Sequence, residues 1–81
     1  MTEEEIHQRF QEAQARCYGI TPRMREHLQL YANGCTVQQV QKVLNVTQNT
    51  VYGTRRRILE LLGADTMTHA VAIGLRTRMI S

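Results

Sequence analysis

Apolar residues recur at helical spacing near the start of the chain. Four of them follow one another at intervals of four, three and four residues: Ile6, Phe10, Ala13 and Cys17. This spacing lays one apolar stripe along a helix. Thr2 and Glu5 have the spacing of a capping box, so the helix is expected to begin at about Glu3, and Gly19 is expected to end it. The apolar stripe of such a helix needs a partner.

A second helix is predicted over residues 22–33. Thr21 supplies an oxygen at the N-cap, and Pro22 occupies the first helical position, where a missing N–H costs nothing. Asn33 and Gly34 form a strong C-terminal stop.

The next two helices are separated by only a short turn. A capping box at Thr36 and Gln39 begins a short helix, which ends at Asn45, a residue that tolerates the left-handed conformation. Thr47 caps the following helix, which we expect to run from about Gln48 to Leu62. Two helices of this length joined by a tight turn are typical of a helix-turn-helix.

A final helix is expected to start near Thr66 or Met67, with Arg76 and Arg78 in its last turn. The hydrophobic fraction of 42% suits a small folded domain, whereas an aromatic fraction of 5% and a single proline argue against a β-sandwich or barrel. The sequence therefore predicts an all-α fold in one compact unit of 81 residues, with short loops.

Charge is distributed unevenly along the chain. Residues 1–19 contain four Glu and two Arg, a balance of −2, whereas residues 20–81 contain eight Arg or Lys against three acidic residues, a balance of +5. The basic part is the one that would meet phosphate, although a solvated basic surface gives the same balance. No apolar run approaches the roughly 18 residues that span a bilayer, and the N-terminus is acidic, so we expect a cytoplasmic protein without membrane contact.

Neither cysteine nor histidine residues suggest a metal or a redox site. Cys17 and Cys35 have no ligand-like spacing, and the three histidines are scattered. We expect reduced, half-buried thiols, no metal, no cofactor and no small-molecule ligand. There is also no glycine-rich phosphate loop and no nucleophile with a base at suitable spacing, so we expect a protein that is not an enzyme.

The helix over residues 48–62 has two distinct faces. With 100° per residue, Ile58 and Leu62 fall within about 20° of Val51 and form its core side. The opposite side carries a set of side chains that we expect to read bases: Asn49, Tyr52, Gly53 and Arg56. Arg can chelate guanine, Asn can chelate adenine, and Tyr offers a ring against thymine methyl groups. Glycine in a helix is less favourable than alanine by about 1 kcal/mol. A close approach of DNA to the backbone would explain why Gly53 is present, and neutral drift is the alternative.

Three consecutive arginines, Arg55, Arg56 and Arg57, fan over roughly 200° of the same helix. At least two of them can therefore reach phosphates beside the groove. The alternative is a solvated basic surface, which is less expected inside the second helix of a helix-turn-helix than at a terminus.

At this point the sequence resembles the LuxR/GerE-type helix-turn-helix domain, a four-helix module of bacterial transcription regulators. The resemblance covers residues 20–80 without a gap. The residues that carry it are Ile-Thr-Pro-Arg at 20 to 23, Glu26, Leu28, Ala32-Asn33-Gly34, Val40, Leu44, Val46-Thr47, Thr50-Val51, Ile58-Leu59, Leu62-Gly63 and Ala70-Val71. It implies a helix-turn-helix domain over residues 20–81, and the apolar spacing places an N-terminal amphipathic helix, residues 1–19, before it.

The resemblance also implies roles for individual residues. Residues 47–62 would be the recognition helix. Together with the charge pattern, it gives a set of phosphate contacts: Arg23, Thr36, Gln38, Thr47, Thr50, Arg55 and Arg57. The last helix, residues 69–78, would form a two-fold dimer contact. Adding the N-terminal stripe gives the expected dimer or partner interface: Ile6, Phe10, Leu61, Ala70, Ile73 and Gly74.

This chain departs from the family pattern at four positions. Met24 replaces an acidic residue, Gln38 replaces a Lys, Thr54 replaces a His, and Leu61 replaces a Lys. Two family cations are thus lost and an apolar residue is gained. The N-terminal helix is also additional. We expect it to cover the domain's own apolar surface; the alternatives are that it extends the dimer or binds another protein.

Two functions follow from these patterns. In the first, a homodimer reads an inverted repeat in double-stranded DNA through its recognition helices, with half-sites about 34 Å apart. In the second, the chain pairs with a larger LuxR-type regulator and blocks it, using Leu61, the last helix and the N-terminal helix. The outward face formed by Asn49, Tyr52 and the three arginines favours direct DNA binding, because an antagonist would not need it.

Overall fold

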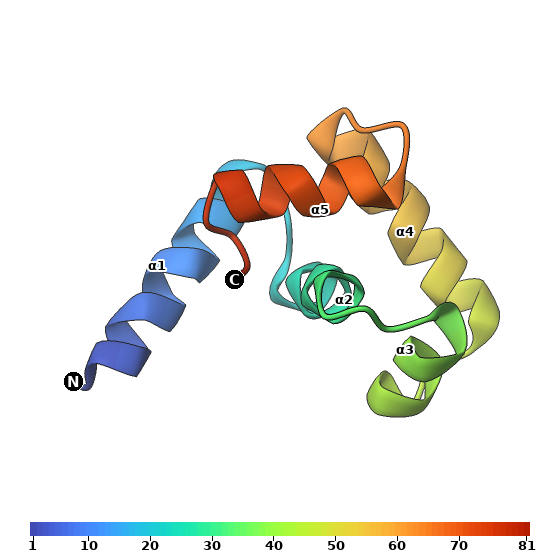
Figure 1. Ribbon diagram of the computed structural model, residues 1–81, viewed down its shortest axis with the longest axis horizontal. Helices are drawn as coiled ribbons and strands as arrows, with labels where there is room; N and C mark the ends of the chain where they lie inside the picture. The colour runs from blue at the N-terminus through green and yellow to red at the C-terminus, as the bar shows by residue number, and fades with distance from the viewer.

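All 81 residues are described by the structure, a computed structural model, and the fold is all-helical. Five helices and no strand follow one another along the chain (Figure 1): α1 Glu3–Cys17, α2 Pro22–Ala32, α3 Val37–Leu44, α4 Gln48–Leu62 and α5 Met67–Arg76. The all-α prediction is confirmed, and each helix lies close to the residues predicted for it.

Every helix begins at a threonine whose hydroxyl accepts a hydrogen bond from a backbone N–H three residues later. This local chemistry explains why the starts were predictable. At α3 the capping box is complete, because Gln39 Oε1 also accepts from the Thr36 N–H at 2.8 Å. At α1 it is not: the Glu5 carboxylate accepts from the Thr2 hydroxyl instead of the backbone N–H. The predicted hydrogen bond from the Glu5 N–H to the Thr2 hydroxyl is therefore present, but the predicted return bond from the Thr2 N–H to the Glu5 carboxylate is not.

Left-handed residues end two of the helices as predicted, with Asn45 at φ 54° after α3 and Gly63 at φ 63° after α4. The end of α5 differs from the prediction. This helix ends at Arg76, and Arg78 lies beyond it at φ 62°, where the chain turns sharply. The turn brings the N–H of Met79 to the Gly74 carbonyl at 2.9 Å. Arg78 is thus a turn residue and not part of the last helical turn.

One core joins α1, α2, α4, α5 and the C-terminal tail. Its eight buried residues are Ala15, Ile20, Leu28, Ile58, Ala64, Ala70, Met79 and Ile80. The tail contributes two of them, Met79 and Ile80, at 0% and 2% exposure. Gln29 holds the tail in place by accepting a hydrogen bond from the Ser81 N–H at 3.0 Å. The C-terminal tail is therefore a structural element, which the helical pattern alone did not reveal.

α1 packs on the body with an unexpected face. Its buried residues are Gln11 and Ala15, and the first ten residues of the chain are all exposed. On a helical wheel Gln11 and Ala15 lie roughly 140–180° from Ile6, so the predicted apolar stripe is not the side of α1 that packs in the core. The helix does pack on the domain, as expected, but through this more polar face and not through the apolar stripe.

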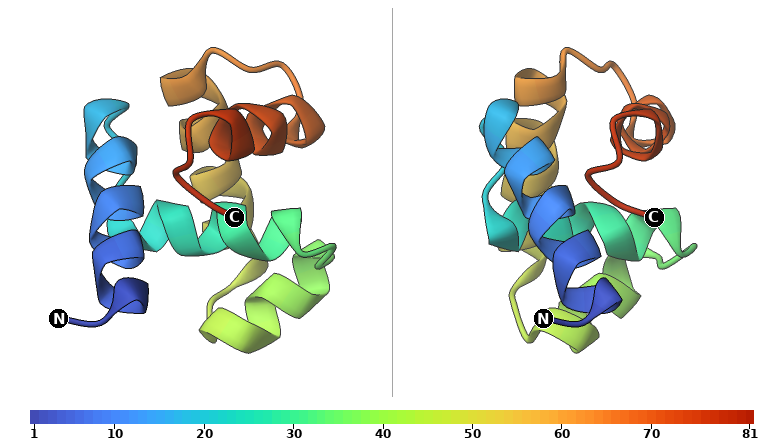
Figure 2. Two further views of the ribbon diagram at one scale, coloured as in Figure 1. Left: turned by 60° about the vertical axis from the view of Figure 1, so that its left-hand side comes forward. Right: turned by 90° about the vertical axis from the view of Figure 1, so that its left-hand side faces the viewer.

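The helices are spread along an elongated body of 36 × 26 × 19 Å. α1 lies at one end, and α3 with the N-terminal half of α4 lies at the other (Figures 1 and 2). None of the helices alone is long and apolar enough to cross a membrane; only α4 and α5 taken together, across a 55° bend, reach that length and composition.

Candidate nucleic-acid interface

The two faces of α4 are separated as the helical wheel predicted. Val51 and Ile58 are 0% exposed and anchor the helix against the body. The four residues expected to read bases all lie on the exposed side: Asn49, Tyr52, Gly53 and Arg56. The structure therefore brings three side chains and the open backbone of Gly53 together on one helix surface.

The N-terminal end of α4 is fixed by a short turn and by threonine hydroxyls. Three residues, 45–47, connect it to α3. The Thr47 hydroxyl accepts from the Thr50 N–H at 3.2 Å, and the two hydroxyls lie 2.9 Å apart. Val40 of α3 is fully buried beside this connection, and α3 packs against both α2 and α4. The exposed face of α4 is thus presented by a well-supported helix.

Gly53 leaves an open patch in the middle of this face. Its backbone has no positive φ, and a Cβ added to it would meet no atom within 4 Å. The protein itself therefore gives no reason for a glycine here. A ligand that approaches the helix backbone closely would give one.

Arg56 and Arg57 differ in how they are held. Arg56 is exposed and forms no ion pair or hydrogen bond within the chain, so its guanidinium is available to a ligand. Arg57 pairs with Glu60 at 3.3 Å, with both side chains 58% exposed. Ion pairs this exposed contribute little to stability, so a phosphate can replace Glu60 without a large cost.

Arg55 lies close to two aromatic rings. Its guanidinium carbon is 5.4 Å from the centre of the Tyr31 ring and 5.5 Å from that of Tyr52, distances typical of cation–π contacts. Burial raises the pKa of Tyr31 above its ordinary value, with Arg55 opposing this and Tyr52 adding to it. The stack links α2 to the exposed face of α4 and holds the Tyr52 ring. Sequence analysis missed Tyr31, because no pattern within one helix shows a contact between two helices.

Arg23 has a role inside the chain. Its guanidinium donates to the Leu44 carbonyl at 3.1 Å and to the Glu26 carboxylate at 3.1 Å. It therefore ties the start of α2 to the end of α3 while its side chain remains 52% exposed. The other expected phosphate contacts on α3 and α4, Gln38 and the threonines at 36, 47 and 50, are exposed.

Most of the expected dimer or partner interface is not on the surface. Ala70 and Gly74 are buried, and Ile73 is partly buried against the core. Leu61 is also partly buried against the core, and its Cδ2 would lie 3.3 Å from a Cβ added to Gly19. The assignment of Ala70 and Gly74 to an outward interface was wrong, because both are buried, Gly74 against Leu28 and Ile80. For Leu61 and Ile73, which keep some exposed surface, it stays a prediction.

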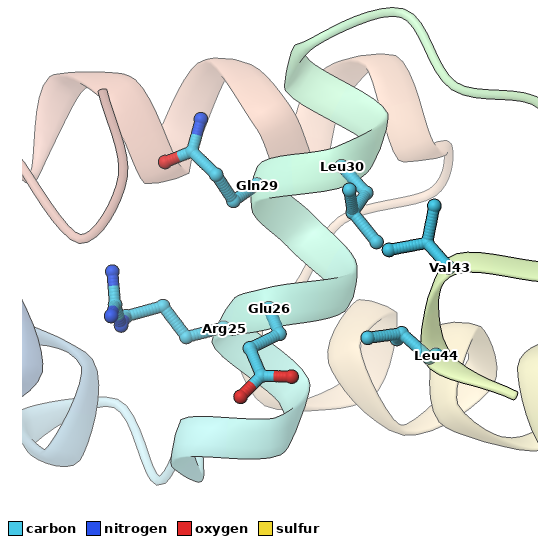
Figure 3. A pocket seen from close by; sticks show the side chains of 6 residues that line it. All are labelled: Arg25, Glu26, Gln29, Leu30, Val43 and Leu44. Atoms are coloured by element: carbon cyan, nitrogen blue, oxygen red, sulfur yellow. The ribbon is translucent and has the colours of Figure 1, made fainter.

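Ile6 and Phe10 are the exposed members of the same set, at 55% and 45%. They border a shallow groove between α1 and the C-terminal segment, together with Glu3, His7 and Arg78. A second groove runs between α2 and α3 (Figure 3). There Leu30 and Val43 point toward each other, while Arg25 and Gln29 point away.

The histidines and cysteines of the protein do not form a second candidate site. No group of three or more His, Cys, Asp or Glu side chains could hold a metal ion. Cys35 is half-buried as expected, but Cys17 is exposed, which corrects the expectation for that thiol. His27 is buried at 1% exposure, and its Nδ1 has no hydrogen-bond partner. Burial lowers the pKa of His27, with Arg23 adding to this and Glu26 opposing it.

Comparison of the chain with protein-family models, with curated protein sequences and with solved structures found no match. The functional interpretation accordingly depends on the arrangement of side chains on α4 and its neighbours.

Proposed function

We propose that this chain is a sequence-specific DNA-binding regulator of transcription. In this proposal α3, the three-residue turn and α4 form a helix-turn-helix of the LuxR/GerE type, and α4 enters the major groove. The observation that carries the proposal is the exposed face of α4, where Asn49, Tyr52 and Arg56 surround the open backbone at Gly53.

The chemistry of this face suits base edges. An unpaired guanidinium can donate two hydrogen bonds to guanine O6 and N7, and an exposed carboxamide can pair with adenine N6 and N7. Over α3 and α4 together, Lys42 and the three arginines oppose only Glu60, a balance of +3. Such a positive surface attracts the phosphate backbone and makes the affinity depend on salt.

An antagonist of a larger LuxR-type regulator is less well supported. That function was expected to use Leu61, the last helix and the N-terminal helix as outward surfaces. Ile6 and Phe10 of the N-terminal helix are exposed, but Ala70 and Gly74 of the last helix are buried and Leu61 is partly buried. The exposed face of α4 has no role in that function, so we favour DNA as the partner of this protein.

The test begins with selection of bound sequences from random DNA duplexes, followed by affinity measurements at two salt concentrations. We expect one enriched sequence, with log affinity falling by about 0.9 per contacted phosphate for each unit of log salt. Arg56→Lys keeps the positive charge but loses the planar fork that reads guanine. It should reduce the preference for the selected sequence over random DNA by about ten-fold, the equivalent of one good bidentate contact.

Arg76→Ala is the matched control for charge, because Arg76 is exposed in the last turn of α5, away from the α4 face. It should leave the sequence preference unchanged. Absence of any enriched sequence, or an equal loss on all sequences with Arg56→Lys, would contradict the proposal.

A further inference from the structure

Tyr52 contributes the only aromatic ring to the exposed face of α4. It is 45% exposed, and an exposed aromatic side chain on a helix can adopt more than one χ1 rotamer. A ring that becomes fixed only on binding loses side-chain entropy, which lowers the affinity for DNA. A contact that fixes the ring before DNA arrives removes part of this loss.

Arg55 provides such a contact. It lies three residues after Tyr52, so the two side chains are neighbours on the surface of α4. The guanidinium carbon of Arg55 lies over the Tyr52 ring, 5.5 Å from its centre, within the range of a cation–π contact. Arg55 forms no hydrogen bond or ion pair within the chain. Since a free arginine side chain has many rotamers, Arg55 can hold the Tyr52 ring only if it is itself held.

Tyr31 of α2 is the residue that holds Arg55. The same guanidinium carbon lies over the Tyr31 ring, 5.4 Å from its centre. Unlike Tyr52, Tyr31 is half-buried, and its helix packs against α3, α4 and α5. Tyr31 also borders a hollow together with Met67 and Val71 of α5, which pack against the core. The Tyr31 ring is therefore fixed by the body of the protein and not by α4 alone.

The Tyr31 hydroxyl takes no part in this arrangement. Its oxygen is buried and has no hydrogen-bond partner. A buried hydroxyl without a partner costs stability, and a buried oxygen is out of reach of DNA. The contribution of Tyr31 is therefore that of its ring. Phenylalanine would supply the same ring without the unsatisfied oxygen.

We propose that Tyr31 is a positioning residue for base reading: it holds Arg55, and Arg55 holds the Tyr52 ring in one rotamer on the exposed face of α4. Tyr31 thereby sets the sequence preference at the base pair beside Tyr52 without touching DNA itself. This inference rests on the proposed function, because it assigns Tyr52 to a base pair. It places part of the sequence preference in α2, a helix outside the helix-turn-helix.

The first test uses NMR spectroscopy of the full chain without DNA. In wild type, the scalar couplings between Hα and Hβ of Tyr52 should indicate one χ1 rotamer, and the tyrosine rings should shift the Cδ protons of Arg55 upfield. Tyr31→Phe should retain both signals. Tyr31→Leu keeps an apolar side chain but removes the ring, so it should average the couplings and reduce the upfield shift. Arg55→Met removes the cation without changing α2 and should average the same couplings.

The second test measures affinity for the selected DNA sequence and for its single-base-pair variants. The base pair read by Tyr52 is the one at which Tyr52→Ala loses its preference. Tyr31→Leu should reduce the preference at this base pair by about two- to five-fold, the range of one exposed cation–π contact, and should leave the base pair read by Arg56 unchanged. In the Tyr52→Ala background, Tyr31→Leu should have no further effect on the preference.

Two variants serve as controls for the second test. Tyr31→Phe should keep the preference of wild type, because it keeps the ring. Tyr18→Leu makes the same chemical change as Tyr31→Leu at a residue that is 42% exposed at the C-terminal end of α1. It should leave the preference unchanged at every base pair, and circular dichroism should show that all variants remain folded.

Tyr52 couplings that are already averaged in wild type, or that Tyr31→Leu leaves unchanged, would overturn the inference without any measurement on DNA. A loss of preference that is equal at all base pairs, or that adds to the loss caused by Tyr52→Ala, would assign a merely structural role to Tyr31. Both results leave the proposed function intact. The proposed function fails by a different result, the absence of any enriched DNA sequence, and the role of Tyr31 in base reading then fails with it.

Discussion

Replacement of Gly53 by alanine is expected to stabilise the protein. Glycine in a helix interior is less favourable than alanine by about 0.8–1.0 kcal/mol, because its backbone loses more freedom on folding. Gly53 lies in the middle of α4 with ordinary helical backbone geometry. Since an added Cβ would meet nothing within 4 Å, no steric term opposes this gain. The free energy of unfolding should rise by about 1 kcal/mol, which is about 4–8 °C in Tm for a domain of this size.

Gly74→Ala is the matched control, because Gly74 is also inside a helix but is buried. A Cβ there would lie 3.0 Å from side-chain atoms of both Ile80 and Leu28. Crowding of this kind typically costs about 1–3 kcal/mol, which cancels or exceeds the same helical gain. The same chemical change should therefore stabilise the protein at one glycine and leave it unchanged or less stable at the other.

Urea denaturation followed by circular dichroism measures both variants. A Gly53→Ala protein that is no more stable than wild type would refute the reasoning, since it would mean that the space beside Gly53 is occupied or that α4 is irregular there. DNA affinity of the same variant carries separate information. If the groove approaches the helix backbone at Gly53, affinity should fall several-fold although stability rises; unchanged affinity would remove close approach as the reason for the glycine.

Two further predictions concern the core. Burial lowers the pKa of His27 below its ordinary value of 6.5. As the pH falls, the unfolded chain therefore binds a proton at His27 before the folded protein does. The contribution of His27 to the free energy of unfolding should be constant above about pH 6.5 and should decrease below it. Urea titrations at about pH 7.5 and about pH 5.5 should show this fall in wild type and a smaller one in His27→Gln, and equal pH dependence of both proteins would contradict it. Ile80→Ala should lower the free energy of unfolding by about 2–5 kcal/mol, because Ile80 is 2% exposed, and a loss below about 1 kcal/mol would show that the tail does not pack in the core.

The helices could be predicted because the signals that set their limits are local. A threonine hydroxyl satisfies an N–H three residues away, and a left-handed Asn45 or Gly63 ends a helix within one turn. The same holds for the faces of α4, since a buried Val51 fixes where every other side chain of that helix points. The residues that share the exposed side of α4 could therefore be identified from spacing alone.

Contacts between distant segments could not be predicted in this way. The buried tail requires the turn at Arg78, a non-glycine residue in the left-handed region, and no sequence rule favours arginine there. The contact of Arg55 with Tyr31 and Tyr52 joins two helices whose relative placement is set by the whole core. For the same reason, the burial of Ala70 and Gly74 could not be predicted from the pattern within α5.

The orientation of α1 connects these points. Hydrophobic periodicity identifies the apolar side of a helix, but it does not say which chain will cover that side. Here Ala15, a small residue on the more polar face, fits into the core at 2% exposure, whereas Ile6 and Phe10 remain 55% and 45% exposed. Each square ångström of apolar surface left in water forgoes about 25 cal/mol, so the folded monomer leaves a favourable interaction unused at this end.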